Sequence, residues 1–501
     1  MSEYYLTPRD VERLANKSMI STSRNLESCD LYVDMDGTVL RTDLIHESVW
    51  RYLKGAPWRA FQIAAVLLRH GRAGLKALLA RKVAMAPSTL PYEDALVAFL
   101  ARRKAEGQRI VLITAAHWRH ARRIAAHLGL FDEVHGSSAH ENLKGVWKLA
   151  RIQLLCAGRP FDYAGDSPAD RPIWRAARSA IFVNAPQQDI LEAEKAGRVE
   201  LVIRSRPPTW RALIKEMRLH QWAKNVLLFV PLLTSGTYSD MARVGLALAA
   251  FLAFGFTASG HYFLNDLLDL DADRAHRSKR HRPMASGDLR LGLGVLGALI
   301  LPVLGFALSA VVLSWKFTAT LLGYFLLTNL YSFYLKRVST VDVVTLALLY
   351  TVRVVAGAVA ISVAISSWLL AFSMFIFISL AYLKRYVEVT TLAAGAAKAG
   401  RRGYSDTDAE TMFSLGIANA TAGIVVLALY ISSAEVKMLY REPDILWLLC
   451  VLLLYWSNRI WVGARRGKIH DDPVVFAIRD RVSQAVGLVA LLIVLAAQIL
   501  P

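Results

Sequence analysis

The stretch NDLLDLDADRAHRSKRHRP, residues 265–283, closely follows the apolar run LALAAFLAFGFTASGHYF and decides how the rest of the chain is interpreted. On a helix, which advances about 100° per residue, Asp266, Asp269 and Asp273 fall within roughly 60° of one another, whereas Asp271 points to the opposite side. Carboxylates on one stripe repel one another unless a cation lies between them, and Mg²⁺ is commonly bound by one or two carboxylates together with substrate phosphate oxygens. The pattern predicts a Mg²⁺ site at the mouth of a membrane helix, with a solvated acidic loop as the alternative.

A basic run follows these carboxylates. Arginine and lysine are the residue types that bind phosphate oxygens, and the run supplies Arg277, Lys279, Arg280 and Arg282. Together the two patterns predict a diphosphate site at a membrane surface.

The composition divides the chain. With 501 residues, 55% of them hydrophobic, it is too long for one domain and too apolar for an ordinary soluble protein. We expect an α/β domain at residues 1–205, a linker or amphipathic lead-in at 206–221 and an all-α polytopic membrane domain at 222–501. Apolar runs predict about nine transmembrane helices, centred near residues 229, 254, 302, 326, 352, 375, 422, 453 and 491, the first interrupted by Pro231.

Loop charges predict the orientation. Lysine and arginine concentrate after the second, fourth, sixth and eighth expected spans, which places those loops and the N-terminal domain in the cytoplasm. MSEYYLTPRDVERLANK lacks the apolar core of a signal peptide. We therefore expect a multi-pass protein of a bacterial inner (plasma) membrane, with its C-terminus on the opposite side.

The net charge of +19 is explained by these loops and by anionic lipid or substrate. The chain has no zinc-finger or RNA-binding motif, so no nucleic-acid partner is expected. A homo-oligomer stays open. Cys29, Cys156 and Cys450 are too scattered for a metal site or a disulfide framework.

A second group of polar residues lies in the N-terminal domain. In CDLYVDMDGTVLRTD a buried strand ends in a tight turn. The side chains of Asp34 and Asp36 on this turn both reach the same opening at the end of the strand. RIVLITAAH is a strand that ends at Thr114, and NLKGVWKLARI places Lys144 near a helix start. FDYAGDSPADRPIW is a strand that ends in two further carboxylates, Asp166 and Asp170.

In that order, these four motifs resemble those of the haloacid-dehalogenase-like (HAD) hydrolases, over about residues 28–185. The resemblance implies a Rossmann-like fold in which Asp34 is the nucleophile that forms an aspartyl-phosphate and Asp36 is the acid/base. It also implies that Thr114 and Lys144 hold the phosphoryl group. A domain kept only for its structure is the alternative.

The same resemblance implies a Mg²⁺ site made by Asp34, Asp166 and Asp170, with the backbone carbonyl of Asp36 completing the shell. It further implies a helical cap at about residues 40–108. Two helical stretches lie there, APWRAFQIAAVLLRHG and LKALLARKVAM. We expect their apolar faces to pack within the cap rather than in lipid, because no long uncharged run occurs.

The membrane half is similar to the UbiA superfamily of intramembrane transferases, over about residues 215–500. NDLLDLDADRAHRSKRHRP matches the NDxxDxxxD motif of that superfamily. YSFYLKRVSTVDVV supplies Tyr331, Lys336 and Asp342 in place of the paired DxxxD of aromatic prenyltransferases. With RLHQWAKNVLLFVPLL and the arginine of LLYTVRVVAG, this departure looks more like the decaprenyl-phosphate phosphoribosyltransferase branch.

The arginine of LLYTVRVVAG is Arg353, and it supports that branch. It lies about 11 residues beyond Asp342, on the same helix face and some 16 Å further along at roughly 1.5 Å per residue. An intramembrane arginine costs on the order of several kcal/mol unless it meets an anion. A lipid phosphate would supply that anion, and an ion pair with an acidic residue of a neighbouring span is the alternative.

The expected function is bifunctional. Phosphoribosyl diphosphate would bind through Mg²⁺ at Asp266, Asp269 and Asp273, with Asn265 and Asp342 in support and with Lys224, Lys279, Arg280 and Arg282 as anion clamps. A polyprenyl phosphate, already ionised at neutral pH, would attack C1 of the ribose without a general base. The HAD domain, with its own Mg²⁺, would then remove the 5-phosphate.

Two other functions stay open: prenyl transfer to an aromatic or other acceptor beside an independent phosphatase, and a non-catalytic membrane scaffold. The late loop KIHDDPVVFAIRDR adds Asp472 or Asp480 to the expected site.

Overall fold

The computed structural model describes residues 5–6, 29–138, 141–394, 404–405, 407–469, 476–477 and 479–499. The chain forms two compact units, residues 1–216 with 266–296 and residues 217–265 with 297–501. The Asp-rich segment therefore groups with the N-terminal domain, although it follows the first long membrane helix in sequence.

The first unit is built on a seven-stranded parallel sheet with the strand order β1-β7-β6-β5-β2-β3-β4. The strands are β1 (Tyr5–Leu6), β2 (Asp30–Val33), β3 (Ile110–His117), β4 (Glu133–Ser137), β5 (Phe161–Gly165), β6 (Ser179–Val183) and β7 (Val199–Ile203). Leu31 and Val33 of β2 pack in one hydrophobic cluster and Tyr32 in another, so both faces of the sheet are covered. Parallel sheets need this burial on both faces, which explains the unbroken apolar runs of β2 and β6.

Helices connect these strands and form the rest of the first unit. They are α2 (Leu44–Gly55), α3 (Arg59–Lys82), η2 (Pro87–Thr89), α4 (Asp94–Ala105), α5 (Trp118–Leu128), α6 (Val146–Cys156), η3 (Pro168–Asp170), α7 (Arg171–Ala176), α8 (Gln187–Lys195), α9 (Thr209–Met217), α12 (Leu270–Ala275), η5 (Lys279–His281) and α13 (Pro283–Ser286). The expected α/β domain with a parallel sheet is confirmed.

The region expected to form a cap, residues 40–108, holds α2, α3, η2 and α4. Gly71, with a φ of 61°, interrupts α3 with a kink. Ile63 and Val66 pack against the hydrophobic core of the domain. Phe61 and Leu68 on the same helix are exposed, which differs from the expectation that its apolar residues pack inward.

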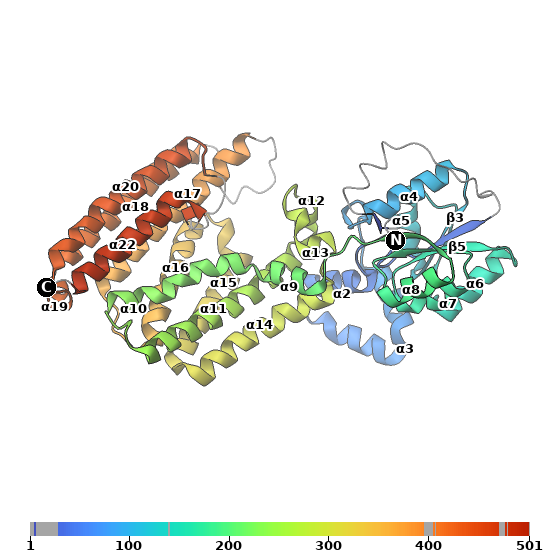
Figure 1. Ribbon diagram of the computed structural model, residues 1–501, viewed down its shortest axis with the longest axis horizontal. Coiled ribbons are helices and arrows are strands. Elements are labelled where there is room, and N and C mark those ends of the chain that lie inside the picture. The colour runs from blue at the N-terminus through green and yellow to red at the C-terminus, as the bar shows by residue number, and fades with distance from the viewer. Residues whose placement is uncertain are drawn as a thin grey trace. The chain divides into compact units, whose positions relative to one another are not determined.

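The second unit is helical. Its helices are η4 (Leu219–Phe229), α10 (Val230–Thr234), α11 (Met241–Leu268), α14 (Leu291–Val312), α15 (Trp315–Phe333), η6 (Leu335–Arg337), α16 (Val341–Ala360), α17 (Ser367–Ala394), α18 (Asp408–Ile431), α19 (Ala434–Leu439), η7 (Pro443–Leu446), α20 (Trp447–Arg465) and α22 (Arg481–Ile499), of which α11 and α14 extend into the first unit. The long helices α18, α20 and α22 lie side by side (Figure 1).

Seven helices among the described residues are long and apolar enough to cross a membrane: α11, α14, α16, α17, α18, the segment containing α20, and α22. The chain is thus a multi-pass membrane protein. The expected span near residue 229 is not one long helix, because the 3-10 helix η4 is followed by the five-residue α10 with Pro231 in its first turn. The span expected near residue 326 is the helix α15, which is not among the seven.

Candidate functional site

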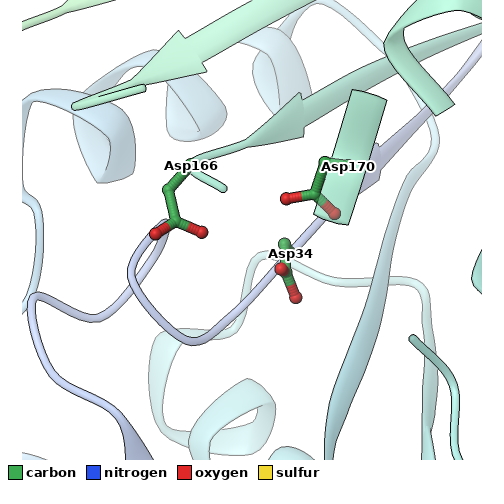
Figure 2. A group of neighbouring side chains, drawn as sticks. All are labelled: Asp34, Asp166 and Asp170. Carbon is green, nitrogen blue, oxygen red and sulfur yellow. The ribbon is translucent and has the colours of Figure 1, made fainter. Parts of the chain in front are cut away.

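Three carboxylates meet where two neighbouring strands end. Asp34 follows β2, and Asp166 follows β5, which pairs directly with β2. Asp170 lies four residues further on, in η3. The ligand oxygens of the three side chains lie within 4.8 Å of one another (Figure 2). Carboxylate oxygens are the donors that Mg²⁺ prefers, so these three residues fit the metal that the HAD motifs imply.

Gly37 lets the loop after β2 approach this cluster. Its φ is 81°, and a Cβ atom built on it would lie 2.1 Å from Asp166 Oδ2. Only glycine combines that backbone conformation with so close a contact. The neighbouring Thr38 hydroxyl donates to Asp166 Oδ1 at 3.4 Å. The glycine of the Asp-x-Asp-Gly-Thr turn therefore makes room for a carboxylate of the next strand.

The lysine of this site is Lys148 and not Lys144. Lys148 is 2% exposed, and its Nζ lies 2.9 Å from Asp34 Oδ2 and 3.2 Å from Asp170 Oδ1. Lys144, the residue predicted for this role, is exposed and precedes the helix start. Since α6 begins only at Val146, a lysine in its first turn, rather than before it, reaches the strand ends.

Hydrogen bonds hold Asp170 in place. It accepts from the Tyr163 hydroxyl at 2.7 Å and from the Ser167 hydroxyl at 3.1 Å, in addition to Lys148. Ser167 and Asp170 form a reciprocal capping box at η3. Such a fully bonded carboxylate is fixed in one orientation before any ligand binds.

Burial and mutual repulsion shift the pKa values of these acids. Burial, opposed by Lys148, raises the pKa of Asp34 to about 6. Burial, and then repulsion from Asp34 and Asp170, raises the pKa of Asp166 to about 7. Burial, followed by Asp43 and Asp34, raises the pKa of Asp36 well above its ordinary value. A raised pKa favours the protonated form of an acid, which suits a proton donor, and Asp36 was predicted in that role.

The remaining residues predicted for this site are Asp36 and Thr114. Asp36 accepts from the backbone N–H of Leu44 at 3.2 Å. Thr114 is fully buried, and its hydroxyl accepts from the N–H of Ala116 at 3.0 Å. The strand was expected to end at Thr114 but continues to His117 after an irregularity in the register.

Arg206 is a residue of this site that the sequence did not reveal. Its Nη2 lies 3.5 Å from the carbonyl of Gly37, and its buried Nε has no hydrogen-bond partner among the described residues. The pattern that surrounds it, RSRPPTW, resembles only a linker. A cation with a spare donor beside the Asp-x-Asp-Gly turn is suited to an anionic substrate.

The Asp-rich segment is not one continuous helix. Helix α11 ends at Leu268, and Asp269 is the N-cap of the short α12. Asp266 and Asp273 are buried, whereas Asp269 is exposed. The break explains why the expected stripe of three carboxylates is reduced to a close pair in the structure.

Arg282 joins that pair. Its Nη1 lies 2.9 Å from Asp266 Oδ1 and 2.6 Å from Asp273 Oδ2. The two carboxylates that were expected to share a divalent cation therefore share a guanidinium. Lys279 and Arg280, the other predicted clamps of this run, are exposed.

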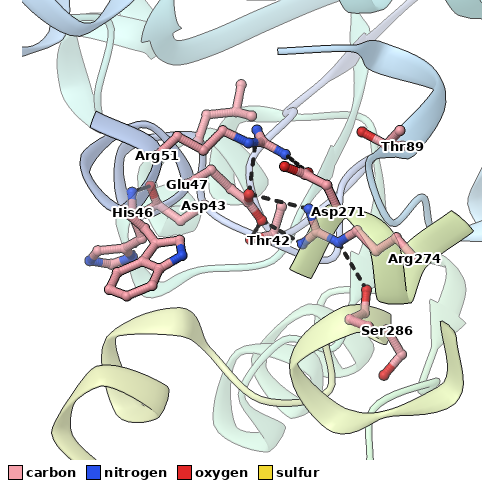
Figure 3. Close-up of polar contacts among 12 residues, drawn as sticks. Thr42, Asp43, His46, Glu47, Arg51, Thr89, Asp271, Arg274 and Ser286 are labelled. Atoms are coloured by element: carbon pink, nitrogen blue, oxygen red, sulfur yellow. Dashed lines mark hydrogen bonds and ion pairs between the residues drawn. The ribbon is translucent and has the colours of Figure 1, made fainter. Parts of the chain in front are cut away.

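Ion pairs fasten the Asp-rich segment to helix α2 within the first unit. Glu47 is fully buried and accepts hydrogen bonds from both terminal nitrogens of Arg274, one of them at 2.5 Å (Figure 3). Arg51 bridges Glu47 and Asp271 (Figure 3). Asp271, predicted to point away from the other carboxylates, does so and faces this junction. Arg41 pairs with Asp288 at 2.5 Å.

In the second unit, Asp342 is bound by Arg385, a buried arginine that follows the sixth expected span and was predicted only as a charge of a basic loop. Arg385 is 1% exposed, and it donates to Asp342 Oδ2 at 2.5 Å and to Oδ1 at 2.8 Å. The Tyr331 hydroxyl donates to Asp342 at 2.8 Å, and Arg385 also pairs with Glu388. Tyr331 and Asp342 are thus brought together, with Arg385 as the missed member.

Arg353 has neutral partners. Its Nε donates to Asn225 Oδ1 at 2.9 Å, and its other nitrogens donate to the carbonyl of Leu349 and to the hydroxyl of Tyr324. Among the residues that the structure describes, no carboxylate lies within ion-pair distance of it. The interhelical ion pair weighed as an alternative is therefore not seen there.

The other predicted residues of the second unit are partly buried. Asn265 donates to His261 Nε2 at 2.8 Å, and Lys224 lies over the ring of Tyr350. Lys336 lies in η6. Asp480 is bound by Arg459 at 2.7 Å, which with Ser483 lowers the pKa of Asp480 to about 2. Asp472 lies outside the described residues.

Comparisons with known proteins agree with both halves. Residues 31–175 match the haloacid dehalogenase-like hydrolase family, and residues 227–479 match the UbiA prenyltransferase family. An uncharacterised protein of Sinorhizobium fredii is 36% identical over 91% of this chain and 89% of its own length. The nodulation protein NoeC of Azorhizobium caulinodans is 36% identical over 52% of this chain and 85% of its own length.

A third relative carries a named activity. The decaprenyl-phosphate phosphoribosyltransferase of Mycolicibacterium smegmatis is 31% identical over 54% of this chain and 87% of its own length. With the family match over half of the chain, these relationships show that the chain belongs to the UbiA prenyltransferase family and carries an N-terminal HAD-like domain.

Proposed function

We propose that this chain transfers phosphoribose from phosphoribosyl diphosphate to a polyprenyl phosphate and then removes the 5-phosphate of the product. The transferase half belongs to the membrane part of the chain, and the phosphatase half is the HAD-like domain. The choice of a lipid phosphate as acceptor rests on Arg353, a buried membrane arginine with only neutral partners among the described residues.

A lipid phosphate supplies the anion that Arg353 lacks. An unpaired cation inside a bilayer is costly, and a phosphate headgroup accepts both nitrogens of a guanidinium in one plane. The side-chain donor of Asn225, its buried Nδ2, has no partner among the described residues. Arg353 and Asn225 thus offer a charged donor and a neutral donor to the same anion, which an apolar prenyl tail would not use.

A different set of residues would bind the donor diphosphate. The carboxylates of Asp266, Asp269 and Asp273 would hold Mg²⁺, which supplies charge neutralisation for the leaving pyrophosphate. Arg282 already bridges two of them, and this flexible cation can turn to phosphate oxygens when the carboxylates bind a metal. Lys279 and Arg280 are exposed and so are free to bind the phosphates of an incoming donor.

The acceptor oxygen needs no deprotonation. A phosphate monoester is ionised at neutral pH and attacks C1 of the ribose as the bond from C1 to the diphosphate breaks. Pyrophosphate leaves with the bonding electrons, so charge and atoms balance without a general base. We infer that Asp342, held by Arg385, fixes Tyr331 in place rather than acting as a base.

In the HAD-like domain, Asp34 attacks the phosphorus of the 5-phosphate and Asp36 gives its proton to the departing ribose oxygen. Water then hydrolyses the aspartyl-phosphate and releases inorganic phosphate. Lys148 and Thr114 hold the phosphoryl oxygens, and Lys148 also keeps Asp34 ionised. Asp34, Asp166 and Asp170 would bind Mg²⁺, which offsets the negative charge of the phosphoryl group.

We propose that the protein lies in a bacterial plasma membrane with its basic loops and its HAD-like domain in the cytoplasm, where phosphoribosyl diphosphate is available. Prenyl transfer to an acceptor is the second candidate, and the description of the matched family favours it.

The test is to supply the purified protein in lipid nanodiscs with radiolabelled phosphoribosyl diphosphate and polyprenyl phosphate, or with radiolabelled prenyl diphosphate and a phenolic acceptor. Lipid-extractable label from the first pair alone supports the proposal. Label incorporated from the prenyl donor alone refutes it and favours the second candidate, and no incorporation from either refutes both. Arg353→Ala protein is the matched control, because it should bind the donor and fail to use the lipid.

A further inference from the structure

Helix α3 exposes a large apolar surface. Trp58, its N-cap, is 72% exposed, Phe61 81% and Leu68 87%. Phe61 and Leu68 are seven residues apart, which is two helical turns, so they lie on one face of α3. Scattered exposed apolar residues are ordinary, but large apolar side chains gathered on one face of a helix mark an interaction surface.

The opposite face of the same helix is already occupied. Ile63 and Val66 pack against the hydrophobic core of the HAD-like domain. A helix that is apolar on two faces is normally buried on both. The protein buries only one of these faces within the described residues, so the face with Phe61 and Leu68 is suited to a second apolar environment.

The charge around this face is of one sign. From residue 48 to residue 92 the sequence has no aspartate or glutamate. Exposed basic residues follow Leu68 on α3: Arg69 directly, and Arg72, Arg81 and Lys82 beyond the kink at Gly71. None of the four has a carboxylate within ion-pair distance in the described part of the chain. An exposed apolar helix face in a segment whose charges are all basic is the pattern of helices that lie in the interface of an anionic membrane.

Helix α2 brings α3 to the end of a membrane-spanning helix. The Trp50 indole N–H donates to the carbonyl of Leu267 at 2.7 Å, and Lys54 donates to the carbonyl of Leu268. Leu268 is the last residue of α11, a candidate membrane span. Only residues 56–58 separate α2 from α3, so the start of α3 is within about 13 Å of the end of α2, at roughly 3.3 Å per residue for an extended chain.

We propose that α3 lies in the headgroup region of the membrane that α11 spans, with Phe61 and Leu68 inserted among the acyl chains and the basic residues facing anionic lipid. The occupant is the bilayer, because the charge is complementary to anionic headgroups and α2 is tied to a membrane-helix end. This surface does not depend on which transfer the enzyme performs. Its effect is to hold the HAD-like domain against the lipid surface, where a phosphate ester on a lipid lies.

The experiment places a nitroxide label on the intact chain in nanodiscs that contain one copy each. Labels are attached to Phe61→Cys and Leu68→Cys in a chain that carries Cys450→Ser, since Cys29 and Cys156 are buried. Leu154→Cys is the matched control, because Leu154 is an apolar residue of the same domain that is 76% exposed and lies on α6. Electron paramagnetic resonance then measures collisions with oxygen, which concentrates in lipid, and with a water-soluble nickel chelate.

Insertion predicts frequent collisions with oxygen and at least about fivefold fewer collisions with the chelate at positions 61 and 68 than at position 154. Raising the fraction of anionic lipid should strengthen this difference. Equal chelate collisions at all three positions overturn the proposal. Protection from both reagents at 61 and 68 also overturns it, because that pattern means cover by protein, either a second copy or another part of this chain.

Discussion

Replacing Lys148 with methionine removes the only cation that contacts both Asp34 and Asp170 among the described residues, at 2.9 Å and 3.2 Å. Methionine keeps most of the side-chain volume, so the change is mainly one of charge. Two buried carboxylates then face each other without this cation, and the phosphoryl oxygens lose a charged donor. We expect phosphatase turnover to fall because both effects act on the nucleophile.

The expected loss of phosphatase turnover follows from the burial of Lys148. Loss of one preorganised donor to a developing charge costs about 10²–10³ in kcat, or roughly 2.7–4 kcal/mol. Lys148 is charged and only 2% exposed, so solvent cannot replace it and a loss at the upper end, about 10³-fold, is expected. Burial opposes its charge, but Asp34 and Asp170 hold the pKa of Lys148 above its ordinary value, so the full charge is present at neutral pH.

The assay is Mg²⁺-dependent hydrolysis of a phosphate monoester by the full chain in nanodiscs. Lys144→Met is the matched control: it lies four residues away, is exposed and should retain turnover within about twofold. Membrane transfer activity, measured on the same preparations, reports whether the Lys148→Met protein is folded. A Lys144→Met loss as large as that of Lys148→Met, or Lys148→Met activity near wild type, would refute the assignment.

Three further outcomes are expected. Arg353→Lys keeps the charge but loses the planar guanidinium, so KM for the lipid phosphate should rise about tenfold while KM for the donor stays unchanged; equal changes in both would contradict a role at the acceptor. Arg274→Ala leaves Glu47 buried and without its main partner, and it should destabilise the first unit by on the order of 3–5 kcal/mol, measured as faster heat inactivation of the phosphatase, with Glu47→Ala added to the same chain restoring part of the loss. Asp34→Asn should abolish phosphatase turnover with transfer nearly intact, and Asp269→Asn should do the reverse; loss of transfer in well-folded Asp34→Asn protein would show that the two activities are not separable.

Periodicity and strand-end chemistry predicted much of the first unit. The strands that end at Asp34 and at Asp166 could be anticipated from the residues alone, whereas the Rossmann-like sheet and the grouping of Asp34 with Asp166 and Asp170 were implied by the resemblance to the HAD hydrolases. The lysine shows the limit of that reasoning, because Lys144 was predicted at the site and Lys148 lies there instead. Both lysines lie near the start of α6, and only the position of the first helical turn decides which one reaches inward.

The Asp-rich segment shows a second limit. A helical stripe was inferred from spacing alone, but α11 ends at Leu268 and the chain turns at Asp269. The ion pair of Glu47 with Arg274 joins residues 227 positions apart, and no local pattern indicates such a pair. The pairing of Arg385 with Asp342 was missed for a related reason. A cation near the end of an apolar run is interpreted as a loop charge until its buried partner is known.

The exposed face of α3 was predicted to be buried because its uncharged run is too short to span a bilayer. That criterion separates spanning helices from others, but it does not separate a packed cap helix from one that lies along a membrane.

The mass of the lipid product tests the coupled activity most directly. Wild-type and Asp34→Asn protein are each given phosphoribosyl diphosphate, polyprenyl phosphate and Mg²⁺, and the lipid extract is analysed by mass spectrometry. We expect polyprenyl-phosphoryl ribose from wild type and the same lipid with its 5-phosphate from Asp34→Asn. Identical products from the two proteins would contradict it.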